Sequence, residues 1–204
     1  MPRILLLLAT VVAFGMSSLA AAQQALAIHP LAERKVAALP AGQLFWRIET
    51  YPSKDSAQAA AGAWSLVAEA AGRVWLFTLG PPGGSTLGGT KVAEVGPIAR
   101  VEAPQYLLRI NEASGPPGSV TPVHSHPGSE AFYVLTGEQS IRGAHGTAVI
   151  KAGRSEPGEG ANMAMQVSSS GARALDSLVM FVVDASKPFS TPASLDGHAT
   201  SEVP

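Results

Sequence analysis

The chain of 204 residues contains no cysteine. It therefore has no disulfide, no thiolate metal ligand and no thiol nucleophile, which excludes disulfide-rich scaffolds and cysteine-dependent enzymes. Its stability must come from a packed core, and the 46% of hydrophobic residues can supply a sizeable one. Any soft metal ligand must be a methionine thioether or an imidazole nitrogen.

Charged side chains are also scarce. They make up 14% of the chain, the formal net charge is −1, and no basic block stands out. Nucleic-acid binding, which needs a basic surface, is therefore not expected. The 16 prolines and 21 glycines predict many turns and few long helices.

The first 22 residues predict an export signal. Arg3 is the only charged residue before Glu33, an apolar run over residues 4–15 follows it, and small residues end at Ala22. This order is typical of a signal peptide cleaved after Ala22, and the apolar run is short for a membrane anchor. We expect a periplasmic or secreted protein with no membrane contact after signal cleavage.

Residues 23–103 predict an N-terminal extension of strands and one helix. Residues 23–42 are alanine-rich with two prolines, which predicts a loosely held segment. Ser53 is a plausible N-cap and Gly72 a plausible C-cap, and the alanines between them predict a helix. Aromatic and β-branched runs predict strands over residues 44–51, 73–80 and 90–96.

Residues 104–184 predict an antiparallel sandwich or barrel, because short strands alternate there with glycine and proline turns. Residues 185–204 contain three prolines and predict a C-terminal tail. The expected fold class is mainly β. The strands expected in the barrel cover residues 105–112, 120–126, 130–136, 138–142, 146–151, 162–168 and 173–183.

Two of the five histidines stand one residue apart, at His124 and His126. Alternate residues of a strand point to the same face, so the two imidazoles are expected side by side. Pro127 and Gly128 predict a turn, after which Glu130 can reach back to the same point. Two imidazoles and a carboxylate form a facial set for Fe, Mn, Ni, Cu or Zn. The alternative to a metal site is that the two histidines lie on a solvated strand and that Glu130 is near them by chance.

The intervals between Gly118, His124, His126, Glu130 and Gly137 resemble the first motif of the cupin superfamily. The resemblance implies a jelly-roll antiparallel β-barrel over residues 104–184. It also implies that His124, His126 and Glu130 hold one metal ion, and that the protein forms homodimers.

The second cupin motif is incomplete. Gly153, Pro157 and Gly158 fit it loosely, Asn162 stands where a glycine is usual, and Met165 stands in place of the third metal histidine. If Met165 is a ligand, the thioether favours copper, especially Cu(I). If Met165 is core filler, as methionine usually is, the site has two histidines and one carboxylate or holds no metal.

Two functions follow from the resemblance. The first is a metal-dependent dioxygenase or isomerase with its substrate in the barrel. The second is a non-catalytic protein that binds a small molecule or copper. Fold alone does not decide between these two functions. The remaining histidines, His29, His145 and His198, are expected to be solvated.

Overall fold

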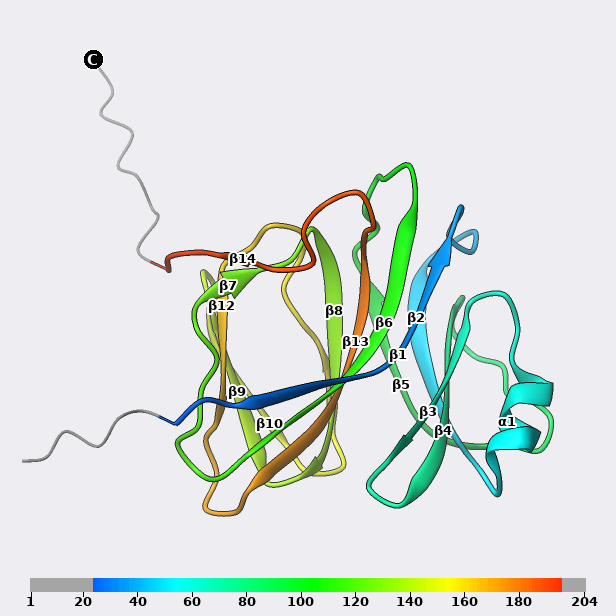
Figure 1. Cartoon of the computed structure of the whole chain (residues 1–204), viewed down its shortest axis with the longest axis horizontal. Helices are drawn as coiled ribbons and strands as arrows, with labels where there is room; N and C mark the ends of the chain where they lie inside the picture. Colours follow the sequence, from blue (N-terminus) through cyan, green and yellow to red (C-terminus); the bar gives the residue numbers. More distant parts are fainter. Residues whose placement is uncertain (1–23, 196–204) are drawn as a thin grey trace, which may run out of the picture.

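The computed structural model describes residues 24–195, so the predicted signal peptide and His198 lie outside the described residues. The described chain forms three antiparallel sheets and one short helix (Figure 1). The mainly β fold class is confirmed. No helix among the described residues is long and apolar enough to cross a membrane.

The predicted extension forms a four-stranded sheet, here called the N-terminal sheet, with strand order β3-β4-β2-β5. Its strands β2, β4 and β5 confirm the three strands predicted in this part of the chain. The bounds are β2 Leu44–Tyr51, β3 Ser65–Ala70, β4 Arg73–Gly80 and β5 Thr90–Ile98.

Two five-stranded sheets face each other to form the barrel. The middle sheet has the order β1-β6-β13-β8-β11, and the outer sheet has the order β10-β9-β12-β7-β14. The middle sheet contains β1 Ala27–Val36, β6 Tyr106–Gly115, β8 Gly128–Thr136, β11 Ser155–Pro157 and β13 Leu175–Asp184. The outer sheet contains β7 His124–Ser125, β9 Glu138–Gly143, β10 Gly146–Lys151, β12 Met165–Ser169 and β14 Thr191–Pro192.

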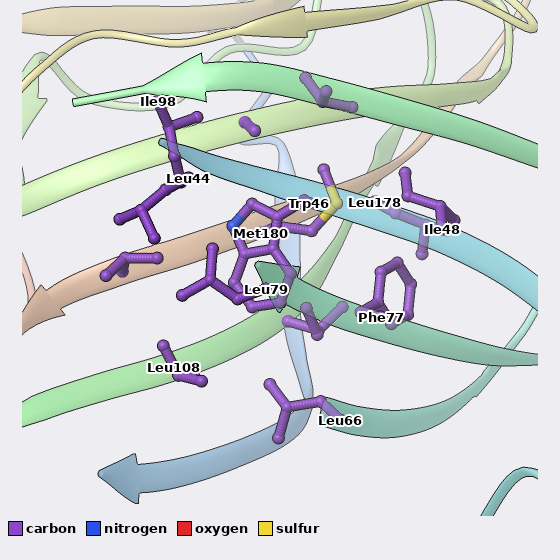
Figure 2. Close-up of a cluster of buried hydrophobic side chains, with 14 of the residues drawn as sticks. Leu44, Trp46, Ile48, Leu66, Phe77, Leu79, Ile98, Leu108, Leu178 and Met180 are labelled. Carbon is purple, nitrogen blue, oxygen red and sulfur yellow. The ribbon is translucent and has the colours of Figure 1, made fainter. Parts of the chain in front are cut away.

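The middle sheet is buried on both faces, which explains the nearly continuous apolar run of β13. One face packs on the N-terminal sheet, with Leu178, Met180 and Val182 joining the core around Trp46 (Figure 2). The other face points into the barrel through Val179, Phe181 and Val183. Alternate side chains of β13 therefore belong to two separate hydrophobic cores, one on each face of the middle sheet.

The helix is shorter than predicted. It spans Lys54–Ala60, and Ser53 caps it in a capping box with Ser56, as the sequence indicates. The residues that follow form β3, which pairs with β4 through a tight hairpin. Ala71 and Gly72 have φ values of 49° and 68°, so Gly72 is a hairpin turn residue and not a helix C-cap.

Both chain ends of the described region join the barrel. Residues 27–36, predicted to be loosely held, form β1 along the edge of β6, and the pairing is irregular between Pro30 and Ala32. An edge strand with a bulge is a position where proline is tolerated. At the other end, Thr191 and Pro192 pair with β7, so this part of the predicted tail is ordered against the barrel.

A buried carboxylate ties the glycine-rich segment 80–89 to the N-terminal sheet. Glu49 is fully buried and accepts hydrogen bonds of 2.7 Å from both the backbone N–H and the hydroxyl of Thr86. Arg47 Nε donates to the same carboxylate at 3.1 Å. Burial raises the pKa of Glu49, but these hydrogen bonds outweigh it and hold the pKa below its ordinary value of 4.5.

We expect Glu49→Gln to lower the free energy of unfolding by about 1–3 kcal/mol at neutral pH, because the amide cannot accept the same charged hydrogen bonds. A depressed pKa stabilises the fold above the unfolded-state value and loses this effect as the pH falls. The difference between wild type and variant should shrink below pH 4.5. Urea unfolding between about pH 3 and about pH 7 measures it.

The control is Glu69→Gln, which removes an exposed ion pair with Lys54. Such surface pairs contribute little, so the change should stay below about 1 kcal/mol. A difference in unfolding free energy between wild type and Glu49→Gln that increased as the pH fell would contradict the lowered pKa of Glu49.

Candidate metal and ligand site in the barrel

A cavity of about 380 Å³ lies between the middle and outer sheets. Its volume falls within the range of small-molecule sites. The walls are mainly apolar and include three phenylalanine side chains, Phe132, Phe181 and Phe189. The polar residues of the wall are Asn111, Thr121, His124, His126, Glu130 and Ser190.

The two histidines meet at this cavity, as their spacing predicts. Their ring centroids are 4.9 Å apart in an edge-on arrangement. His124 Nδ1 lies 2.8 Å from the Pro122 carbonyl oxygen, and His126 Nδ1 lies 2.6 Å from the Phe189 carbonyl oxygen. A carbonyl can only accept, so each Nδ1 donates, and in the neutral ring the Nε2 atom then keeps its lone pair. This is the tautomer that a metal ligand needs.

Glu130 lies on β8 beside the histidines, and its side chain is buried. Its Oε2 atom is 4.0 Å from His126 Nε2, the only ion-pair contact of Glu130 within residues 24–195. Burial, reinforced by the negative charge of Glu159, raises the pKa of Glu130 to about 8. Among the described residues, this buried carboxyl group has no lysine or arginine partner.

Burial also keeps His126 neutral. It lowers the pKa of His126 to about 4, and the charges of His124 and Arg109 act in the same direction against the Phe189 hydrogen bond. A neutral imidazole is the form that coordinates metals. His124 is half-buried and is therefore more accessible to solvent than His126.

Met165 lies on β12 directly opposite His124 in the antiparallel pairing. Its side chain is 1% exposed and belongs to the barrel core, and it is not among the residues that line the cavity. Within residues 24–195, no three His, Asp or Glu side chains are grouped closely enough to form a metal site by themselves. Metal ligation by His124, His126, Glu130 and Met165 remains a prediction.

Residues 158 and 162, in the segment predicted to resemble the second cupin motif, both approach the candidate site. Asn162 has a φ of 61°, and asparagine tolerates this left-handed conformation better than most residues. Its N–H donates to the His126 carbonyl at 2.7 Å. A Cβ atom on Gly158 would lie 2.5 Å from Glu130 Cγ and 2.6 Å from Phe132 Cε2. The backbone at Gly158 therefore packs directly against the Glu130 side chain and restricts its position.

The segment after β13 supplies a wall that sequence reasoning placed in a tail. The Phe189 ring lies 4.8 Å from the His126 ring and 4.9 Å from the Phe181 ring. The Arg109 guanidinium sits 4.3 Å from the centre of the Phe189 ring, which allows a cation–π contact. Sequence reasoning missed Phe189 and Asn111. As expected, His29 and His145 are exposed.

No protein-family model matches the chain, and no curated protein matches it. Solved structures similar to it include a cupin-like protein from Thermotoga maritima, with 14% identity, 45% of this chain and 68% of that chain covered, and a TM-score of 0.39. A cupin superfamily protein from Desulfitobacterium hafniense is 16% identical, over 38% of this chain and 68% of that one, with a TM-score of 0.34.

A putative sugar phosphate isomerase from Acidithiobacillus ferrooxidans is 26% identical over 37% of this chain, with a TM-score of 0.33. The chain spans about half of that protein, 49% of its length. The strand order describes the barrel independently of these likenesses, with His124 on β7 of the outer sheet and His126 just after that strand. The two facing five-stranded antiparallel sheets by themselves form a jelly-roll type of barrel. Of the four predicted site residues, His124, His126 and Glu130 line its cavity and Met165 does not.

Proposed function

We propose that this chain is an exported protein whose cupin-like barrel binds one divalent or cuprous metal ion and a small molecule. One observation carries the proposal. Two imidazoles, each oriented by an Nδ1 hydrogen bond to a backbone carbonyl, line one cavity together with the buried carboxyl group of Glu130, and His126 Nε2 lies 4.0 Å from Glu130 Oε2. Export rests on the sequence of residues 1–22.

Two of the candidate ligands approach the spacing that a shared metal ion requires. Ligand atoms lie about 2.0–2.2 Å from zinc, so two of them in a tetrahedral site are about 3.4 Å apart. The separation of 4.0 Å between His126 Nε2 and Glu130 Oε2 is somewhat longer, so the two side chains would move slightly closer on metal binding. A buried carboxylate without a cationic partner is unfavourable, and a metal ion would supply the missing charge.

A metal ion with open positions supplies Lewis-acid or dioxygen chemistry, which suits a dioxygenase or an isomerase. The barrel's own residues would orient the ligand and exclude water through the Phe132, Phe181 and Phe189 walls. Apart from the three metal ligands, the polar wall residues among those described are Asn111, Thr121 and Ser190. The amide of Asn111 and the hydroxyls of Thr121 and Ser190 do not titrate near neutral pH, so they are poor general acids or bases. This favours the alternative of non-catalytic binding.

The test is the metal content of the mature protein, purified without a polyhistidine tag and measured by elemental mass spectrometry. We expect about one metal ion per wild-type chain and less than about one tenth of that in His124→Ala, because a metal ligand is lost. The control is His145→Ala, which removes an exposed histidine at a hairpin tip. Wild-type protein that stays metal-free after reconstitution, or equal content in His124→Ala, would contradict the proposal.

Met165→Leu in the same series decides between the two kinds of metal site. The exchange nearly conserves volume and is usually tolerated in a core. Bound copper that is lost in this variant would make the thioether a ligand and favour a copper-binding protein. Iron, manganese, nickel or zinc retained in the variant would make Met165 core filler and favour the enzyme-like site.

A further inference from the structure

The wall of the barrel cavity provides no permanent positive charge. Among the described residues that line it, none is a lysine or an arginine. The imidazoles of His124 and His126 carry no charge in their neutral form, and the carboxyl group of Glu130 adds no positive charge in either protonation state. An anion that entered this cavity would lose its hydration and meet no cationic side chain in exchange, which is unfavourable.

Arg109 lies beside the cavity without lining it. Its guanidinium lies 4.3 Å from the centre of the ring of Phe189, which is a wall residue. Its Nε atom donates to Glu33 Oε2 at 2.9 Å, so its positive charge already has a carboxylate partner. The charge of Arg109 is therefore engaged by Glu33 and by the Phe189 ring, and it does not supply the cation that the wall lacks.

The walls and the volume of the cavity favour an aromatic ligand. The rings of two wall residues, Phe181 and Phe189, have centroids 4.9 Å apart and an interplanar angle of 71°. Aromatic rings prefer such edge-on contacts, and a ring of a ligand can extend them. An apolar cavity of about 150 Å³ binds benzene. The volume of about 380 Å³ is therefore enough for two fused rings.

We infer that the cavity binds an uncharged aromatic molecule of one or two rings and rejects anions of the same size. The aromatic class follows from the phenylalanine walls, and the rejection of anions follows from the absence of lysine and arginine among the described wall residues. This inference deepens the proposed function by naming the ligand class. It rests on that proposal for the ligand site but not for the metal.

Ile28 is a position at which the charge of the wall can be changed without disturbing the core. It lines the cavity, yet its side chain is 44% exposed. Its register partner on β6 is Ala113, which also lines the cavity, so the two side chains lie on the same face of the middle sheet. A long basic side chain at this position can keep its charged end in water.

Two probes with the same ring system test the inference. Naphthalenemethanol is uncharged, and naphthalenesulfonate is an anion. Isothermal titration calorimetry is expected to show that wild type binds naphthalenemethanol at least about tenfold more tightly, because the sulfonate has no cationic partner in the wall. A sulfonate is used because a carboxylate would itself be a metal ligand.

Ile28→Arg should raise the affinity for naphthalenesulfonate about threefold, the effect of a weak and partly exposed ion pair, and leave that for naphthalenemethanol nearly unchanged. Val149→Arg is the matched control, because Val149 is 54% exposed and does not line the cavity. It should change neither affinity.

Equal affinity of wild type for the two probes, tighter binding of the sulfonate, or binding of neither would overturn the inference. So would equal effects of Ile28→Arg and Val149→Arg, because the discrimination would then not arise in this cavity. If Ile28→Arg does not fold, the wild-type comparison still decides.

Metal content measured on the same wild-type preparation separates the two proposals. Metal-free protein that prefers naphthalenemethanol would refute the metal site and leave the ligand class standing. Metal-loaded protein that binds neither probe, or that prefers naphthalenesulfonate, would support the metal site and overturn the ligand class.

Discussion

Trp46→Ala is expected to lower the free energy of unfolding by about 3–5 kcal/mol, the usual cost of removing a large aromatic side chain from a core. Trp46 is fully buried between the N-terminal sheet and the middle sheet, in one cluster with Leu108 and Met180 (Figure 2). Because this cluster joins both parts of the molecule, wild type should unfold in a single cooperative transition. Urea denaturation followed by circular dichroism measures both quantities.

Trp64→Ala is the matched control. Trp64 is 36% exposed, and its Nε1 atom donates to the Ala38 carbonyl at 2.8 Å. Its loss should cost about 1 kcal/mol, the contribution of a typical hydrogen bond. Two separate transitions in wild type, or equal costs for the two tryptophans, would show that the N-terminal sheet and the barrel are stabilised independently.

The second large effect is expected at Glu130. Glu130→Gln should weaken metal binding at least about 100-fold, because even groups that only orient a ligand contribute about 10–100-fold. The metal-free variant should be no less stable than wild type, because a buried carboxyl group without a cationic partner is replaced by a neutral amide of the same shape. Competition with a chelator of known affinity measures the first effect, and thermal unfolding of metal-free protein measures the second.

A purely structural Glu130 would give a different pair of results. Glu130→Gln would then lower the melting temperature of the metal-free protein and leave the metal affinity of the folded fraction unchanged. Glu156→Gln provides the comparison, because Glu156 lies on the neighbouring strand β11 and is exposed. It should change neither quantity.

Most strands could be predicted from the sequence, because β-branched and aromatic runs end there at glycine or proline. The sequence predicts a longer helix than the structure contains, for an identifiable reason. Alanine favours helix, and Gly72 adopts the left-handed conformation that both a helix C-cap and a tight hairpin require. Local sequence does not distinguish these two uses. Pairing of β3 with β4, which is a tertiary contact, decides in favour of the hairpin.

The candidate site was found only in part. His124, His126 and Glu130 could be placed on one cavity because they occur close together with a strand periodicity. Asn111 and Phe189 come from distant segments, and each has an ordinary local context: an asparagine within a strand and a phenylalanine between prolines. Only the strand order of the barrel brings them to the same cavity. These two residues can therefore be assigned to the cavity only from the three-dimensional structure.

The chain order of the strands has a consequence for folding. The N-terminal sheet uses only residues 44–98, so its contacts are comparatively local and can form early. The cavity is different, because it needs Ile28 near one end of the described chain and Phe189 near the other. Contacts of such long range form slowly. We therefore expect the barrel cavity to be the last part of the molecule to form, after the whole chain has been synthesised.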